Sequence, residues 1–298
     1  MGRFVAIALA ASAVFAGCVA SEGDRGAVTH VKAKRVSRDP VVDLAAAPTT
    51  TVAPPTTVAP APVHLATVSS PRARSRGSRP AAAPTAASVW QRYNGQLTGG
   101  TYVVGRANGP GLNVSPSPDT APAVTLSNPL QSGAPRTVVI VGDPGGDWLQ
   151  VLLPMRPNSS VGWIHRGDVD VSRVQYRVEI DRAAHRLRVF DGAENVVADE
   201  PVAVGKPSTP TPSGQFFAVE LLQPSNPRGD YGPFAFTLSA YSDVYQTFGS
   251  GDGAVGMHGT NEPSSVGRPV SHGCIRLNNA AIQRLAGILP LGTPVFIR

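Results

Sequence analysis

Hydrophobic and polar positions alternate with a period of two in short runs along the C-terminal part of the chain. Residues 177–181 and 186–190 place apolar side chains at every second position. Such alternation predicts strands that bury one face. Residues 279–287 instead carry apolar residues at helical spacing, with Asn279 as the expected cap and Gly287 at the end, so they predict one short helix. The predicted fold class is therefore mainly β: a β-sandwich-like domain with one short helix.

A second β-rich segment precedes this domain. Residues 138–141 are an apolar run, a turn rich in Gly and Asp follows, and the strand pattern resumes at Trp148 and again at Trp163. This order resembles a bacterial SH3-like module. We therefore predict a small SH3-like β-barrel over residues 89–173 and the larger β domain over residues 174–298. Trp148 and Trp163 could contact the cell wall, but we favour the interpretation that both fill the barrel core.

Residues 1–18 have the features of an export signal. A positive start at Arg3 is followed by an apolar run, too short to span a bilayer, that ends in Ala16-Gly17-Cys18. Small residues before a cysteine resemble a bacterial lipobox, in which Cys18 is lipidated and becomes the mature N-terminus. In the alternative, an ordinary signal is cleaved and Cys18 is discarded. We expect an exported lipoprotein of the cell envelope, anchored to the membrane through Cys18 and facing the cell wall.

Residues 19–88 lack apolar periodicity and are rich in Pro, Ala and Thr, with two basic clusters. This composition predicts a disordered, extended basic linker. The whole chain has a formal net charge of +6, which suits anionic surroundings such as a cell wall or an acidic membrane surface. The charge alone would also fit nucleic acid, but no nucleic-acid partner is predicted.

The chain has only two cysteines. Exported proteins usually pair their cysteines in disulfides. Here Cys18 is assigned to the signal or its lipid, so we expect Cys274 to be kept as a thiol in the mature domain. At this stage a reactive thiol and a buried inert cysteine fit equally well.

Cys274 lies in a glycine-containing turn, and His258 precedes it in the chain. A thiol, an imidazole and glycines whose backbone can approach a substrate are the parts of a nucleophilic acyl-transfer site. Gly273 lets successive backbone N–H groups point the same way, which predicts an oxyanion hole beside the nucleophile.

Several segments together resemble the signature of the YkuD-type L,D-transpeptidases, enzymes that cross-link peptidoglycan. The match covers about residues 176–298. The matching segments are His258-Gly259-Thr260, the loop with Gly267, Ser271-His272-Gly273-Cys274-Ile275-Arg276-Leu277, Val204-Gly205, the turn Thr209-Pro210-Thr211-Pro212-Ser213-Gly214, and Gly292-Thr293-Pro294-Val295.

The resemblance implies a role for each residue of the site. Cys274 would attack the carbonyl before the terminal D-Ala of a peptidoglycan stem tetrapeptide, the donor, while His258 takes the thiol proton and the Gly259 carbonyl orients the imidazole. The N–H groups of His272, Gly273 and Cys274 would hold the oxyanion. D-Ala would depart, and the donor would remain bound to Cys274 as a thioester. An amine of a second stem, the acceptor, would then attack this thioester and form a 3→3 cross-link. The family needs no metal or organic cofactor, and carbapenems acylate it.

Five further residues have two interpretations each. His272 could be a second catalytic imidazole, although we favour a structural role. Ser271 could bind an imidazole or satisfy turn amides. Arg276 could pair with a substrate carboxylate or with a structural one. Tyr231 and Tyr241 could line the stem-peptide groove or belong to the core.

Other functions remain open at this point. With water as the acceptor, the same Cys274 would act as an L,D-carboxypeptidase, and a wall endopeptidase would also use a thiol and an imidazole. From another class, the chain could be a non-catalytic wall-binding lipoprotein. The order of His258 before Cys274 and the intact Gly273 favour the transpeptidase.

Overall fold

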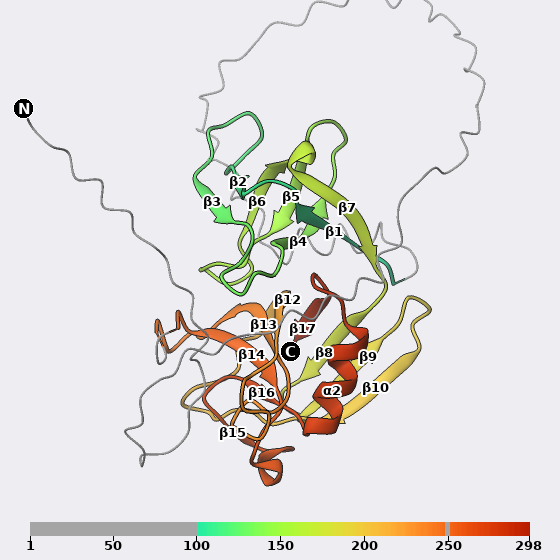
Figure 1. Ribbon diagram of the computed structural model, residues 1–298, viewed down its shortest axis with the longest axis vertical. Coiled ribbons are helices and arrows are strands. Elements are labelled where there is room, and N and C mark those ends of the chain that lie inside the picture. The colour runs from blue at the N-terminus through green and yellow to red at the C-terminus, as the bar shows by residue number, and fades with distance from the viewer. Residues whose placement is uncertain (1–99, 248–250) are drawn as a thin grey trace, which may run out of the picture.

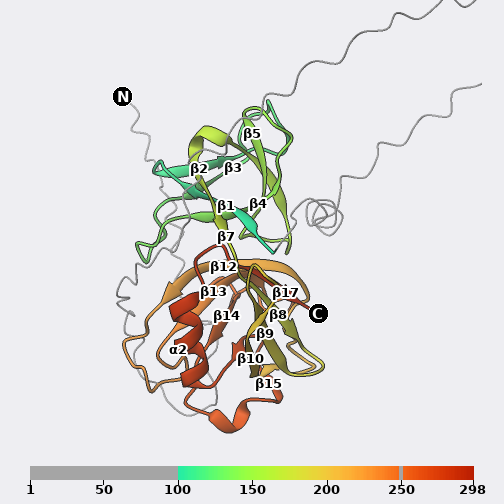
Figure 2. The same ribbon diagram turned by 90° about the vertical axis from the view of Figure 1, so that its right-hand side faces the viewer.

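The computed structural model describes residues 100–247 and 251–298. The predicted signal and linker, Cys18 included, lie outside the described residues. Two β-rich units follow each other along the chain and meet across an apolar interface (Figures 1 and 2). Among the described residues, no helix has the length and hydropathy needed to cross a bilayer.

The first unit is built on a five-stranded antiparallel sheet with the order β6-β5-β4-β1-β7 and a β2–β3 hairpin beside it. One set of its buried side chains forms a small core, and β4, buried at its first five positions, also faces the interface with the second unit. The strands are β1 (Tyr102–Ala107), β2 (Gly111–Val114), β3 (Val124–Ser127), β4 (Thr137–Gly142), β5 (Trp148–Leu152), β6 (Val161–His165) and β7 (Val169–Val174).

The two tryptophans of this unit do not fill its core, contrary to expectation. Trp148 and Trp163 are half-buried, because Leu149 and Ile164, their neighbours in β5 and β6, take the inward positions. The Trp148 indole donates a hydrogen bond to Asp119 (3.1 Å) instead.

The second unit holds an eight-stranded sheet with the order β10-β9-β8-β17-β12-β13-β14-β16 and a small parallel β11–β15 pair. The β17–β8 and β14–β16 pairs are parallel, and the other pairs are antiparallel. The strands are β8 (Arg177–Asp181), β9 (Arg186–Phe190), β10 (Val196–Pro201), β11 (Val204–Gly205), β12 (Gly214–Leu222), β13 (Ala235–Tyr241), β14 (Ala254–His258), β15 (Pro269–Ser271), β16 (Ile275–Arg276) and β17 (Pro294–Ile297).

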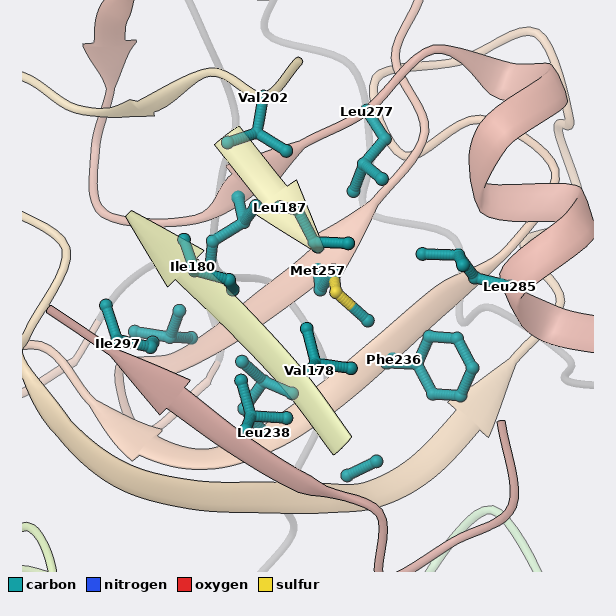
Figure 3. Close-up of a cluster of buried hydrophobic side chains, with 14 of the residues drawn as sticks. Val178, Ile180, Leu187, Val202, Phe236, Leu238, Met257, Leu277, Leu285 and Ile297 are labelled. Atoms are coloured by element: carbon teal, nitrogen blue, oxygen red, sulfur yellow. The ribbon is translucent and has the colours of Figure 1, made fainter. Parts of the chain in front are cut away.

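One α-helix, α2 (Asn279–Ile288), covers this sheet within the described part of the chain. It contributes buried Leu285 to a core that contains Val178 and Phe236 (Figure 3). The mainly β fold class with one short helix is therefore confirmed. The predicted cap is wrong in detail: Asn278 occupies the cap position, whereas the Asn279 side chain accepts a hydrogen bond from the Thr260 N–H (2.8 Å).

The two units share an apolar interface. Phe217 and Val219 of β12 belong to the same buried cluster as Val104, Val139 and Leu152 of the first unit. Figure 2 shows the first unit seated above β12 and β17. Burial of these side chains from both units favours one fixed arrangement of the pair.

Candidate active site

At the edge of the large sheet, the predicted base and nucleophile lie on or next to two paired strands. β14 and β16 run parallel, with Met257 opposite Ile275 and His258 opposite Arg276. Cys274 directly precedes β16, and its Sγ accepts a hydrogen bond from the Gly256 N–H (3.4 Å). A donor placed there stabilises negative charge on the sulfur, as a thiolate nucleophile requires.

The imidazole of His258 is held in one tautomer. His258 is fully buried, and its Nδ1 lies 2.6 Å from the Gly259 carbonyl oxygen. A carbonyl can only accept, so Nδ1 carries the hydrogen and Nε2 keeps the lone pair. The Gly259 N–H donates to Phe234 O (3.2 Å), and the Tyr231 ring lies 4.9 Å from the imidazole, centroid to centroid. These contacts orient a base at Nε2.

His258 is neutral at physiological pH. Burial, opposed by the hydrogen bond to Gly259 and aided by the charge of Arg276, lowers the pKa of His258 from 6.5 to about 4. Within the part of the chain that the structure describes, its Nε2 has no hydrogen-bond partner. A buried lone pair without a protein donor is suited to accept a proton during a reaction.

This depressed pKa predicts a stability loss in acid. The unfolded imidazole binds a proton below pH 6.5, whereas the folded one resists protonation until about pH 4. The contribution of His258 to the free energy of unfolding should therefore be complete above pH 6.5. It should decrease by about 3 kcal/mol as the pH drops toward 4. Urea unfolding of the full chain across this range checks it, with His258→Gln as the control. If the variant loses as much stability in acid as the wild type, another group is responsible.

Ser271 organises the turn that carries Cys274. Its buried hydroxyl donates to Cys274 O (2.6 Å) and accepts from the Gly273 N–H (3.1 Å). Gly273 has φ +126°, which is a glycine conformation. Ser271 thus forms hydrogen bonds with backbone groups of the turn, which is one of the two interpretations given above. In this conformation the Gly273 N–H is used inside the turn, so the predicted oxyanion role of that N–H is not available until the bond opens.

Two threonines support the same turn, and the sequence reasoning did not identify their role. Thr211 Oγ1 donates to Gly273 O (2.8 Å) and accepts from the Gly205 N–H (2.8 Å). Thr209 Oγ1 donates to Ser271 O (3.3 Å). Both threonines belong to the Thr209–Gly214 turn noted in the sequence, which was the available signal for these contacts.

The other predicted residues occupy distinct places. His272 Nε2 lies 3.4 Å from Lys206 Nζ, and burial, followed by the charges of Lys206 and Arg276, lowers the pKa of His272. The buried Arg276 guanidinium donates to Glu262 Oε2 (2.9 Å). Arg276 therefore pairs with a structural carboxylate here, and its substrate role stays a prediction.

The two predicted tyrosines lie in different parts of the second unit. Tyr231 lies against His258, but Tyr241 lies at the interface of the units, where its hydroxyl donates to Pro154 O (2.8 Å). Burial, with a contribution from Asp252, raises the pKa of Tyr241 to about 12. The described contacts thus bring only Tyr231 together with the imidazole.

A small cavity of about 10 Å³, room for about one water molecule, lies beside the sulfur. Its walls come from the β13–β14 connection on one side and from the Cys274 turn on the other. The lining residues are Ser242, Tyr245, Gly253, Ala254, Val255, His272, Gly273 and Cys274. Within residues 100–247 and 251–298, no group of three His, Cys, Asp or Glu side chains is arranged to hold a metal ion.

The oxidation state of Cys274 decides whether this site can react. The chain's other cysteine, Cys18, lies outside the described residues. Because a disulfide sulfur is not a nucleophile, acyl-transfer chemistry at this site requires the reduced form of Cys274.

Comparisons with known proteins show the family of the second unit. A family model for the L,D-transpeptidase catalytic domain, YkuD, matches residues 175–297. A Bacillus licheniformis protein named as the L,D-transpeptidase YkuD is 36% identical over 155 residues, which are 50% of this chain and 85% of that protein. Its Bacillus subtilis namesake is 39% identical over 128 residues, 43% of this chain and 69% of that protein.

Solved structures were found as well. An L,D-transpeptidase from Mycobacterium smegmatis is 19% identical with a TM-score of 0.35, and the match covers 54% of this chain and 90% of that one.

Proposed function

Because the chain belongs to the YkuD family of L,D-transpeptidases, we propose that reduced Cys274 carries the acyl group during its reaction on peptidoglycan. One observation carries the proposal: His258 is buried and neutral, with Nδ1 bonded to Gly259 and a lone pair on Nε2. A general base of this kind is what a thiol nucleophile needs.

The first half-reaction forms a thioester. The sulfur of Cys274 attacks the carbonyl carbon before the terminal D-Ala of a donor stem tetrapeptide, and His258 Nε2 takes the S–H proton. Backbone N–H groups of the turn, with His272 and Cys274 as candidates, stabilise the oxyanion. The C–N bond then breaks, the imidazolium returns its proton to the leaving amine, and D-Ala departs.

The second half-reaction restores the thiol. A side-chain amine of an acceptor stem attacks the thioester carbonyl and loses a proton to His258. The C–S bond breaks, and the sulfur takes up that proton as the 3→3 amide forms. With water in place of the amine, the product is a shortened stem and the enzyme acts as a carboxypeptidase.

We also propose that the chain works in the cell envelope. Its substrate lies outside the cytoplasmic membrane, and the sequence begins with an export-like segment that ends in Cys18. Lipidation of Cys18 and the SH3-like character of the first unit are parts of this proposal.

Intact-mass analysis with imipenem tests the acyl-enzyme. The full chain is reduced first, and Cys18→Ser and Cys274→Ala variants are treated in parallel. We expect one covalent adduct on the wild type and on Cys18→Ser, and none on Cys274→Ala. An equal adduct on Cys274→Ala, or none on the reduced wild type, would contradict the proposal and favour a non-catalytic wall-binding protein.

Analysis of digested cell wall separates the two possible acceptors. Cells that overproduce the wild type should contain more 3→3 dimers than cells that overproduce Cys274→Ala. Unchanged dimers together with shortened stems would assign the carboxypeptidase activity instead.

A further inference from the structure

A hairpin loop of the first unit reaches into the second unit beside the candidate site. Arg156, between β5 and β6, donates from Nη2 to the carbonyl oxygens of Ser242 (3.1 Å) and Tyr245 (2.7 Å). Asn158 pairs with Tyr241 in both directions, accepting from its N–H (2.8 Å) and donating to its carbonyl (2.7 Å). The β5–β6 loop therefore holds the chain where it leaves β13.

The carbonyls that Arg156 binds belong to a wall of the Cys274 pocket. Ser242 and Tyr245 line that pocket, as does Gly253 from the other end of the same connection. The Ser242 N–H donates to Gly253 O (2.9 Å), and the Ser242 hydroxyl accepts from the Tyr245 N–H (3.0 Å). Arg156 thus binds the carbonyl groups of this turn, whereas the turn's own residues bind its N–H groups.

The fit around the guanidinium is close. Its centre lies 4.7 Å from the centroid of the Tyr241 ring, in cation–π geometry. A Cβ added at Gly253 would lie 2.9 Å from Arg156 Nη2 and 2.4 Å from Tyr245 O, and Gly253 has φ +77°. Only glycine admits the guanidinium and the turn at this distance. A planar group with several donors can bind two carbonyls at once, whereas an ammonium binds as a point charge.

We propose that Arg156 is a positioning residue for the donor stem, supplied by the first unit to the active site of the second. By holding the carbonyls of Ser242 and Tyr245, it sets the wall against which the stem peptide binds beside Cys274. The first unit is then part of the substrate site and not a spacer. This inference rests on the proposed function, because it takes the stem peptide as the ligand of the pocket.

The test compares Arg156→Ala and Arg156→Lys in the full chain, in a Cys18→Ser background so that Cys274 is the one thiol. Acylation by a synthetic stem tetrapeptide is followed by mass as a function of peptide concentration. We expect Arg156→Ala to lower kcat/KM by about 10- to 100-fold, chiefly through KM, since a displaced wall binds the donor poorly. Arg156→Lys should recover part of the loss. The rate of Cys274 alkylation by iodoacetamide, which does not need the wall, should stay within about twofold.

Ser132→Ala is the matched control. Ser132 also crosses the interface, donating to Glu220 Oε2 (2.5 Å), but it is not among the residues that line the pocket. Its donor KM should equal that of the wild type. Arg156 is merely structural if Ser132→Ala raises KM equally, or if iodoacetamide alkylation and the melting temperature fall in parallel with acylation. An unchanged KM in Arg156→Ala overturns this inference alone, whereas a wild type that forms no thioester overturns the proposed function as well.

Discussion

Replacement of His258 by glutamine should slow the acylation of reduced Cys274 by about 10²- to 10⁴-fold at neutral pH. Glutamine keeps a polar group of similar size near the Gly259 carbonyl, but it has no basic nitrogen to take the thiol proton. The buried position of His258 and its single tautomer leave Nε2 as the base. The measurement is the rate of the imipenem mass shift under excess reagent, in the Cys18→Ser background.

His272→Gln is the control for this prediction. His272 lines the pocket, where its Nε2 lies 3.4 Å from the Lys206 ammonium and its ring 6.4 Å from that of Tyr245, whereas the Gly259 carbonyl holds His258 in the tautomer of a base. We expect His272→Gln to lose less than about tenfold. Comparable losses in the two variants would mean that both imidazoles take part, and a larger loss at His272 would reverse the assignment.

Replacement of Gly273 by alanine should lower the acylation rate by about 10²- to 10³-fold, comparable with the loss of one oxyanion donor. Its φ of +126° is strained for alanine, although a Cβ there would meet nothing closer than 3.7 Å. Backbone strain will therefore displace the turn that Ser271 and Thr211 hold, and with it the N–H groups beside Cys274. The same mass-shift assay measures the loss.

Gly267→Ala separates this effect from general destabilisation. Gly267 also has a positive φ, +87°, with nothing within 4 Å of an added Cβ. Both substitutions should cost about 1–3 kcal/mol of stability, measured by urea unfolding. Only Gly273→Ala should lose acylation. If Gly267→Ala slows acylation as much, the loss reflects stability and not the geometry of the turn.

Local patterns were enough to predict many elements of this protein. The strands expected at 177–181 and 186–190 are β8 and β9, and the helix expected at 279–287 is α2, one residue longer. These predictions succeeded because the period of apolar residues is a local property of a half-buried strand or helix. The family could be recognised for a similar reason, since each of its signature segments is a short local run of residues.

The same reasoning failed where burial depends on which face an element turns inward. Trp148 and Trp163 were expected in the core because large apolar side chains usually lie there, yet the sheet gives the inward positions to their neighbours. Asn279 was expected to cap the helix and instead holds the Thr260 N–H. The type of a residue predicts its average burial and its preferred position in a helix. Tertiary packing decides which of several neighbouring residues takes a given buried or capping position.

By itself, the sequence determined the mainly β class, the residue types of the site and the family. The tertiary structure decided how the site is held. It showed that burial keeps His258 neutral, that Thr211 supports the Cys274 turn, and that Arg156 reaches the pocket wall from another unit. The physical reason is that these effects come from residues far apart in the chain. Only the packing of strands and units brings such residues within hydrogen-bond distance or removes water from around them.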